Sequence, residues 1–415
     1  MSQQSPKFNL RTTLRGMAAL AIVFALAAVL TPSACSQTFQ VLHTFSGGDG
    51  QLPYAGLTMD AAGRLYGTTC GNYTSTHGTV FKLTPSGSSW VLTALYTFSG
   101  GSDGACPQSR VIFGPEGSLY GTTTAGGDKC QICGTVFSLR PPLTVCKTAL
   151  CPWTETILYA FSGYDGVEPM GDLNFDGAGN LYGTAYEGGM GGRGNVYELT
   201  STGGGWTENV IFDFPQYGAL GNPSAGVMFD KAGNLYGTAE SDYGGVFELT
   251  PSGGGWLYSE IYTLHGGIEG SNPRAGVIFD NAGNIYSATT RYGVGGGGTI
   301  FGLTPSDIGW VFSALYSFVG TSGPLGNLFM DAAGNFYGTT FADGAYGLGS
   351  VFKLSPGPSG WTYTSLHDFT GGDDGANPVS NVLFDAAGNL YGTASAGGNK
   401  GPCFNGCGVV WEIMP

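Results

Sequence analysis

The chain has 415 residues, of which 75 are glycine and only 11% are charged, while 42% are hydrophobic and 13% are aromatic. The aromatic content excludes a disordered chain, glycine without a three-residue period excludes collagen, and so much glycine argues against a helical bundle, because each glycine inside a helix costs about 1 kcal/mol. This composition leaves an all-β fold or a glycine-rich repeat array. The net charge of −14 argues against binding to nucleic acid or an anionic membrane.

The first 36 residues have the pattern of a secretory signal peptide. Lys7, Arg11 and Arg15 form a basic segment, and the apolar run Met17–Leu30 is shorter than the roughly 20 residues of a transmembrane helix. Small residues follow this run, and we expect cleavage before Gln37.

The mature protein is then residues 37–415, which we expect to form a single domain without a transmembrane segment. We expect it to be extracellular or periplasmic. The alternative is a lipoprotein anchored through Cys35, although Pro32 stands where such sites usually have leucine.

One nine-residue phrase, of the pattern Asp-x-Ala-Gly-Asn-Leu-Tyr-Gly-Thr, recurs throughout the mature chain. Its copies occupy residues 60–68, 114–122, 176–184, 230–238, 280–288, 331–339 and 385–393. The interval between the tyrosines of successive copies lies between 50 residues (Tyr236 to Tyr286) and 62 residues (Tyr120 to Tyr182). Repeats of about 50 residues are typical of propellers and related arrays.

Each repeat contains four short runs with strand character. In the fifth repeat these runs are Ala275–Phe279, Asn284–Thr290, Thr299–Leu303 and Trp310–Phe318. A turn with glycine at residue 283 separates the first two, and Thr304-Pro305-Ser306 is expected to end the third. Four antiparallel strands per repeat predict a propeller blade.

The two ends of the chain complement each other. The seventh repeat has the runs Val379–Phe384, Asn389–Ala394 and Val409–Ile413 but no fourth run, whereas Phe39–Phe45 resembles the fourth run of other repeats. A fourth strand supplied from the N-terminus would leave no open sheet edge. We therefore predict an all-β, seven-bladed β-propeller with four antiparallel strands per blade, the last blade being completed by the N-terminal strand.

The cysteines agree with export. Removal of Cys35 leaves eight, an even number, which favours disulfides in an oxidising compartment. Three pairs are close in sequence, and two cysteines remain for each other: Cys130/Cys133, Cys146/Cys151, Cys403/Cys407 and Cys70/Cys106. A metal site is the alternative, but the four histidines, at 43, 77, 265 and 367, are scattered and supply no second pair of ligands.

The repeat resembles the GloVer (Gloeo–Verruco) tandem repeat of secreted bacterial proteins. The resemblance rests on the nine-residue phrase followed by G-T-V-F-K-L-T-P (78–85) and W-x-x-x-x-L-Y-x-F-S-G (90–100). It implies an exported, propeller-like array and assigns no catalytic residue. The core D-x-x-G-N-L-Y also resembles the NHL-type propeller repeat, for which binding is a common use.

Most recurring residues are interpreted as framework. We expect the repeated tyrosines (66, 120, 182, 236, 286, 337, 391) and the tryptophans at 90, 153, 206, 256, 310 and 361 to pack between blades. Six of the seven nine-residue phrases begin with aspartate, the exception being Gly114, and we expect this aspartate to stabilise its turn. We expect His43 and His367 to replace framework tyrosines. The Ser-Gly-Gly-x-Asp-Gly loops, with Asp49, Asp103, Asp165, Asp373 and Asp374, are the place where Ca²⁺ or a saccharide would bind.

The loops between the second and third strands vary most among the repeats, and variation on a fixed scaffold indicates a binding face. The accessible candidates on this face are Tyr73, Asp128, Tyr186, Tyr243, Tyr292 and Tyr346. No zinc-protease or phosphate-loop motif is present in the sequence, and no catalytic or metal-binding residue is predicted.

We therefore predict a secreted, monomeric, non-enzymatic propeller that binds a protein or a glycan at the cell surface or envelope, without a cofactor other than Ca²⁺. Two alternatives stay open: a hydrolase or lyase with a metal or acid site in the axial channel, and a structural envelope component. A cluster of acids and histidines at the channel mouth would favour an enzyme, whereas a shallow aromatic surface would favour binding.

Overall fold

The computed structural model describes residues 37–72, 76–142, 153–218, 220–398 and 403–415. The predicted signal peptide, Tyr73, Cys146 and Cys151 lie outside these residues. The chain divides into two compact units, Met1–Thr38 with Pro415, and Phe39–Met414. The second unit is described by itself below.

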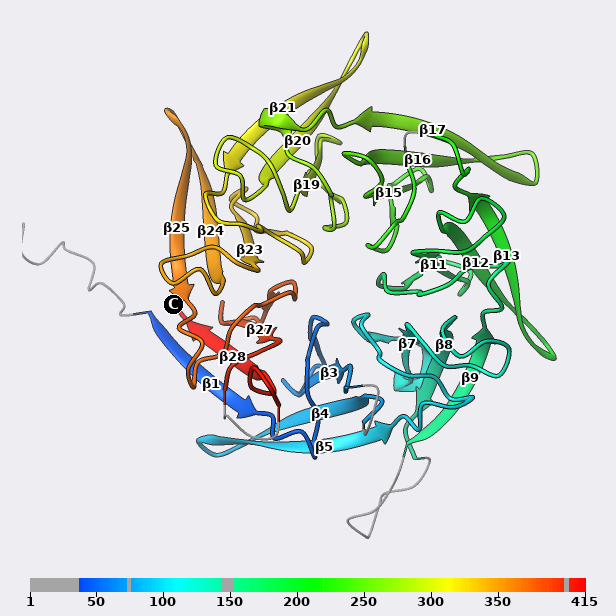
Figure 1. The fold of residues 1–415 in the computed structure, drawn as a ribbon, viewed down its shortest axis with the longest axis horizontal. Coiled ribbons are helices and arrows are strands. Elements are labelled where there is room, and N and C mark those ends of the chain that lie inside the picture. The colour runs from blue at the N-terminus through cyan, green and yellow to red at the C-terminus, as the bar shows by residue number, and fades with distance from the viewer. Residues whose placement is uncertain (1–36, 73–75, 143–152, 219, 399–402) are drawn as a thin grey trace, which may run out of the picture. The chain divides into compact units, whose positions relative to one another are not determined.

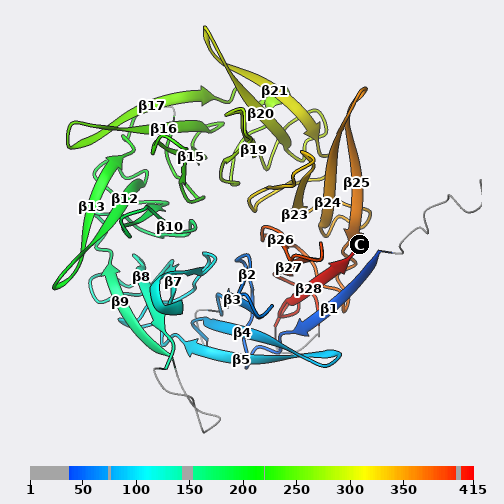
Figure 2. The same ribbon diagram turned by 180° about the vertical axis from the view of Figure 1, so that it is seen from behind.

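The unit Phe39–Met414 consists of seven four-stranded antiparallel sheets that follow one another around a ring (Figures 1 and 2). Each sheet uses four strands that are consecutive in the chain, except the last, whose order is β1-β28-β27-β26. This is the predicted seven-bladed β-propeller. We number the blades from β2–β5 (first) to β26–β28 with β1 (seventh).

The strands lengthen from the centre of the ring outward. The innermost strands are β2 (Thr58–Met59), β6 (Ile112–Phe113), β10 (Asn174–Phe175), β14 (Met228–Phe229), β18 (Ile278–Phe279), β22 (Phe329–Met330) and β26 (Leu383–Phe384). The second strands are β3 (Leu65–Thr69), β7 (Leu119–Thr123), β11 (Leu181–Ala185), β15 (Leu235–Ala239), β19 (Ile285–Ala288), β23 (Phe336–Thr340) and β27 (Leu390–Ala394).

The third strands are β4 (Thr79–Ser86), β8 (Thr135–Arg140), β12 (Asn195–Thr202), β16 (Gly245–Ser252), β20 (Thr299–Ser306), β24 (Ser350–Gly357) and β28 (Val409–Met414). The outer strands are β5 (Ser89–Thr97), β9 (Thr154–Ala160), β13 (Gly205–Asp213), β17 (Gly255–Thr263), β21 (Gly309–Ser317), β25 (Gly360–Asp368) and β1 (Thr38–Thr44). Two short 3-10 turns, η1 (Pro115–Gly117) and η2 (Gly267–Glu269), complete the described elements.

The third strand is longer than the sequence indicated. In the fifth blade β20 continues through Thr304-Pro305-Ser306, and Pro305 lies opposite Trp310 of β21. The pairing of β20 with β19 already ends at Leu303, so Pro305 has a neighbouring strand on one side only. A proline is tolerated there because its missing N–H does not interrupt a ladder on the open side.

The N-terminal strand closes the ring as predicted. Phe45 is fully buried and Leu42 is buried in a cluster with Leu57 and Phe81 of the first blade. On the other side, the Phe39 ring stacks on His367 of the sixth blade at 3.6 Å. The strand that completes the seventh blade therefore also packs against both neighbouring blades.

The repeated tyrosines and tryptophans pack between neighbouring blades, as expected. Tyr182 of the third blade lies edge to face against Trp256 of the fourth, with ring centres 6.1 Å apart, and Tyr391 lies likewise against Trp90 at 6.3 Å. Aromatic pairs in this geometry stabilise by about 0.5–1.5 kcal/mol beyond their buried area.

The aspartate of the nine-residue phrase holds its turn together. Asp176 Oδ1 accepts the N–H groups of Ala178 and Asn180, both at 2.8 Å, and its Oδ2 accepts the Asn180 side-chain amide at 2.8 Å. Burial works to raise the pKa of Asp176, but these hydrogen bonds outweigh it and lower the pKa below its ordinary value. The expected role in the turn is confirmed.

The acid of the Ser-Gly-Gly-x-Asp-Gly loop bonds to the outer strand of the same repeat. The Tyr96 hydroxyl donates to Asp103 at 3.1 Å, and His43 and His367 pair with Asp49 and Asp374 at 3.0 and 3.1 Å. The two histidines thus take the framework place of tyrosine, as the sequence indicated.

Two glutamates at the outer contacts between blades make stability depend on pH. Burial first, and Asp103 next, raise the pKa of Glu155 to about 7; burial and Asp165 raise the pKa of Glu208 to about 7, against the opposing charge of Lys129. The folded protein therefore keeps protons that the unfolded chain releases near pH 4.5. The contribution of these two groups to stability is greatest below that pH and is lost as the pH rises through about 7.

We expect Glu155→Gln/Glu208→Gln to flatten this dependence and to stabilise the protein at pH 8 by about 1 kcal/mol, a value discounted because both groups are partly screened by solvent. Thermal unfolding at pH 5 and pH 8 measures the effect. Asp307→Asn, at the exposed tip of the β20–β21 hairpin, is the control. Equal pH dependence in the double variant and the parent would contradict the assignment.

Candidate functional site: the axial cavity

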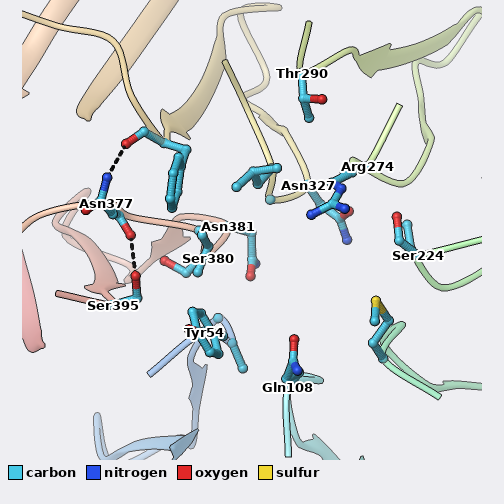
Figure 3. A pocket seen from close by; sticks show the side chains of 18 of the residues that line it. Tyr54, Gln108, Ser224, Arg274, Thr290, Asn327, Asn377, Ser380, Asn381 and Ser395 are labelled. Atoms are coloured by element: carbon cyan, nitrogen blue, oxygen red, sulfur yellow. Dashed lines mark hydrogen bonds between the residues drawn. The ribbon is translucent and has the colours of Figure 1, made fainter. Parts of the chain in front are cut away.

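A cavity of about 950 Å³ opens at the centre of the ring. Two positions of the repeat supply much of its wall. One is the residue directly after a recurring proline, before the innermost strand, and the other is the residue that opens the loop after the second strand. We call them the post-proline position and the loop position. The post-proline residues are Tyr54, Gln108, Met170, Ser224, Arg274, Leu325 and Val379, and six of the seven loop positions line the cavity, as Cys70, Tyr186, Glu240, Thr290, Phe341 and Ser395. Figure 3 shows side chains from several blades around this opening.

The backbone of the repeat has an unusual conformation just before the recurring proline, and the side chain there contacts the loop position of the preceding blade. The residue before the recurring proline has a positive φ of 52–58° at Leu52, Cys106, Glu168, Asn222, Asn272 and Asn377. Asparagine suits this conformation. Its side-chain amide reaches the carbonyl of the loop position in the preceding blade, from Asn222 to Tyr186 at 3.0 Å and from Asn377 to Phe341 at 3.0 Å. This bond, the asparagine clasp, joins neighbouring blades at the cavity wall.

A disulfide replaces the asparagine clasp between the first and second blades. Cys106 occupies the asparagine position and Cys70 the loop position, and the two are bonded. The disulfides Cys130–Cys133 and Cys403–Cys407 lie in loops between second and third strands. These three predicted pairs are confirmed, and the fourth falls outside the described residues.

The equivalence of the disulfide and the asparagine clasp gives a direct test. The variant Cys70→Thr/Cys106→Asn can form the side-chain bond of other blades at a φ that asparagine tolerates, whereas Cys70→Thr/Cys106→Ala cannot. We expect both to be less stable than the parent, since they open a cross-link between residues 36 apart, and the asparagine variant to exceed the alanine variant by about 1–2 kcal/mol. Chemical denaturation measures the difference, and equal stabilities would show that the clasp contributes nothing.

Both acids of the cavity are paired with arginines. Asp172 accepts two hydrogen bonds from Arg110, one from the backbone N–H at 2.8 Å and one from Nε of the side chain at 3.1 Å. Glu240 Oε2 accepts a hydrogen bond from Arg274 Nε at 3.0 Å. The rest of the wall is rich in amides and hydroxyls, among them Asn327, whose Oδ1 accepts the Gly276 N–H at 2.6 Å. The wall is thus neither an acid–histidine cluster nor a shallow aromatic surface. Over the described ranges, no three His, Cys, Asp or Glu side chains lie close enough to hold a metal ion.

The family model described as the Gloeobacter/Verrucomicrobia repeat matches residues 11–242, 144–323 and 239–415 of the chain. The chain belongs to this repeat family. The family resemblance seen in the sequence is therefore confirmed. No curated protein matches the chain.

Solved structures are similar to this repeat-family member at low sequence identity. The extracellular domain of a protein described as a hybrid two component system from B. thetaiotaomicron is 12% identical, with a TM-score of 0.55 over 90% of this chain and 39% of that one. The same domain described as part of a one component system gives a TM-score of 0.54, with 40% of its chain covered. A protein described as an oxidoreductase (glucose dehydrogenase) from Thermus thermophilus is 16% identical, with a TM-score of 0.44 over 91% of this chain and all of that one. The chain thus spans about two fifths of the B. thetaiotaomicron structures, and the likeness shows the fold alone.

The predicted site residues of the repeat-family member lie at different places on the face that carries the loops between second and third strands, which we call the loop face. Tyr186 is partly buried in the cavity wall. Tyr243 and Tyr292 are exposed and contact each other edge to face at 6.1 Å, and Tyr346 is also exposed. Asp128 is exposed and does not line the cavity. Of the predicted site residues that the structure describes, only Tyr186 lines the cavity, while Tyr243 and Tyr292 form a separate pair.

The post-proline position was missed from the sequence, although a signal was present. Seven different residue types occupy it beside a proline that recurs in every repeat. Such variation next to a fixed residue is the same signal that singled out the loops.

The loops of the cavity face also expose large apolar side chains. Those between the second and third strands and those that lead to the next blade carry Ile132, Tyr164, Met190, Tyr217, Tyr243, Ile268, Tyr292, Val294, Val319, Tyr346 and Phe404. We call this set the apolar rim. Single exposed apolar side chains are ordinary on a protein surface, whereas contiguous ones mark an interaction site, and in this set Tyr243 and Tyr292 contact each other. Among the described residues, no helix has both the length and the apolar character to cross a membrane.

Proposed function

We propose that this repeat-family member is an exported, non-enzymatic binding protein that holds a saccharide in its axial cavity. The observation that carries the proposal is the chemistry of the wall, in which amides and hydroxyls from several blades stand beside Tyr54 and Tyr186. Saccharides offer many hydroxyl groups together with apolar ring faces, and fixed amides, hydroxyls and aromatic rings complement both. The three disulfides are compatible with the oxidising compartment of an exported protein.

The absence of catalysis is part of the proposal. A general acid needs a carboxyl group held neutral near pH 7, and a general base needs one free to accept a proton. Asp172 and Glu240 instead each pair with an arginine guanidinium group, at 3.1 and 3.0 Å, so neither is a free carboxyl group. The open alternative, a hydrolase or lyase, would require one of these pairs to separate.

A glycan array probed with residues 37–415 tests the function. We expect binding to a defined class of saccharide, and we expect Leu325→Trp to abolish it, because Leu325 lines the cavity and indole would fill part of it. Leu257→Trp, on the outer strand β17 where Leu257 is 60% exposed, is the matched control and should bind normally. An array without binding, or binding unaffected by Leu325→Trp, would refute the cavity as a saccharide site.

The apolar rim favours a second candidate function, the binding of a protein partner on the loop face. Tyrosines on a rigid scaffold suit such contacts because they bury a large area with few rotatable bonds. A protein partner held by the rim would still bind Leu325→Trp and would be lost in Tyr243→Ser/Tyr292→Ser. The opposite pattern would support the saccharide cavity.

A further inference from the structure

One sector of the cavity wall contains polar atoms whose bonding capacity is unused. Glu240, at the loop position of the fourth blade, has a side chain only 6% exposed, and its Oε2 accepts Arg274 Nε at 3.0 Å. Its Oε1 is buried and accepts no hydrogen bond from the described residues, and the same holds for Ser224 Oγ. We call Tyr186, Ser224, Glu240 and Arg274 the Glu240 sector.

The rest of the wall does not share this property. Asp172 uses both carboxylate oxygens on Arg110, Ser395 Oγ donates to the Asn377 carbonyl at 2.8 Å, and Ser380 Oγ donates to the Thr393 carbonyl at 3.3 Å. A buried acceptor without a donor costs about 1–3 kcal/mol, and more when it is charged. In native proteins such atoms call for a specific explanation, and a ligand that supplies the donor is one.

The geometry of the Glu240 sector matches a sugar. Two neighbouring hydroxyl groups of a sugar ring can act as donor and acceptor together. Arg274 is 47% exposed, and its bond to Glu240 engages one of the five N–H donors of the guanidinium, so further donors are available to a ligand oxygen. Tyr186 lies near this ion pair. Burial raises the pKa of Tyr186, the charge of Glu240 raises it further, and the charge of Arg274 lowers it.

We infer that the Glu240 sector binds one neutral sugar ring through two neighbouring hydroxyl groups, one donating to Glu240 Oε1 and the other accepting from Arg274. This inference rests on the proposed saccharide function. A carboxylate on the ligand would compete with Glu240 for Arg274 and leave the buried Glu240 without its partner, so the sector selects against acidic sugars. Because Oε1 is buried, a side chain of the wall must move before the ligand reaches it.

Isothermal titration with two sets of hexasaccharides tests the inference. The neutral probes are the hexamers of glucose, mannose, galactose and xylose, and the acidic probes are hexagalacturonate and hexamannuronate. We expect at least one neutral hexamer to bind residues 37–415, and the acidic hexamers to bind at least tenfold more weakly. Glu240→Gln should weaken the neutral ligand about tenfold, since it replaces a charge-assisted hydrogen bond by a neutral one.

The controls separate the inference from the proposed function. Glu187→Gln removes one exposed acid from the same face and should leave affinity unchanged. Ser224→Ala, a smaller change, should weaken binding about threefold and serves if Glu240→Gln does not fold. If neither the array nor any hexamer shows binding, the proposed function is wrong; if the array shows a ligand and no neutral hexamer binds, the inference alone is wrong. If a hexamer binds, is lost in Leu325→Trp, and is unaffected by Glu240→Gln and Ser224→Ala, or if an acidic hexamer binds most tightly, the inference alone is wrong.

Discussion

A chain that begins at Ser46, and so lacks β1 and Phe45, is expected to be largely unfolded or aggregated at 37 °C. The deletion removes the fully buried Phe45 and the buried Leu42, at about 1.5–3 kcal/mol for each side chain. It also removes the ladder of β1 with β28, at about 0.5–1.5 kcal/mol for each hydrogen bond, and exposes an edge strand. The sum exceeds about 5 kcal/mol, which is a large part of the 5–15 kcal/mol typical of folded domains.

The control for this deletion is the chain that begins at Gln37, which retains the whole strand. Circular dichroism on heating and size-exclusion chromatography compare the two. A synthetic peptide of residues 37–45 added to the truncated chain should restore part of the lost stability, because it can fill the open edge. A truncated chain that melts at the temperature of the control would disprove closure by the N-terminal strand.

The blade architecture was predictable from the sequence because a propeller repeats one local pattern. The strands and the turn at the aspartate are visible in single repeats, and the complementary ends are visible when the N-terminal segment is compared with the seventh repeat. The cysteine pairs Cys130–Cys133 and Cys403–Cys407 are close in sequence. The end of the third strand was misplaced because Pro305 was taken as a strand terminator. That interpretation fails where the strand has a neighbour on one side only.

The cavity could not be built from the sequence in the same way. Its wall is formed by residues of all blades, and which positions face the axis depends on the closed ring rather than on any single repeat. Glu240 illustrates this, because the other units carry cysteine, threonine, tyrosine, phenylalanine or serine at its position. Glu240 is buried and paired because Arg274 of the next blade lies beside it, and the sequence does not show that these two residues are close in space.

The glycine that follows the tyrosine in the nine-residue phrase has a packing role, which a single added methyl group should reveal. In the seventh blade a Cβ on Gly392 would lie 2.3 Å from Cζ2 of the fully buried Trp411, and in the first blade a Cβ on Gly67 would lie 2.6 Å from Cζ of Phe81. Neither glycine has a positive φ, so the constraint is steric and not a matter of backbone conformation. The fifth blade carries Ser287 here, whose hydroxyl donates to the Ala275 carbonyl at 2.9 Å, so the prediction concerns Gly392 and its tryptophan.

Gly392→Ala is therefore expected to destabilise the protein by about 1–3 kcal/mol or more, since a closely packed core relieves such a clash only by moving side chains and backbone. Gly203→Ala is the matched control, because a Cβ there meets no atom within 4 Å, and it should change stability by less than about 0.5 kcal/mol. Trp411→Leu frees the space that the methyl group needs, so the loss in Gly392→Ala/Trp411→Leu should be smaller than the sum of the two single losses. Chemical denaturation of the four variants measures this coupling, and additive losses would mean that Gly392 is required for a reason other than its contact with Trp411.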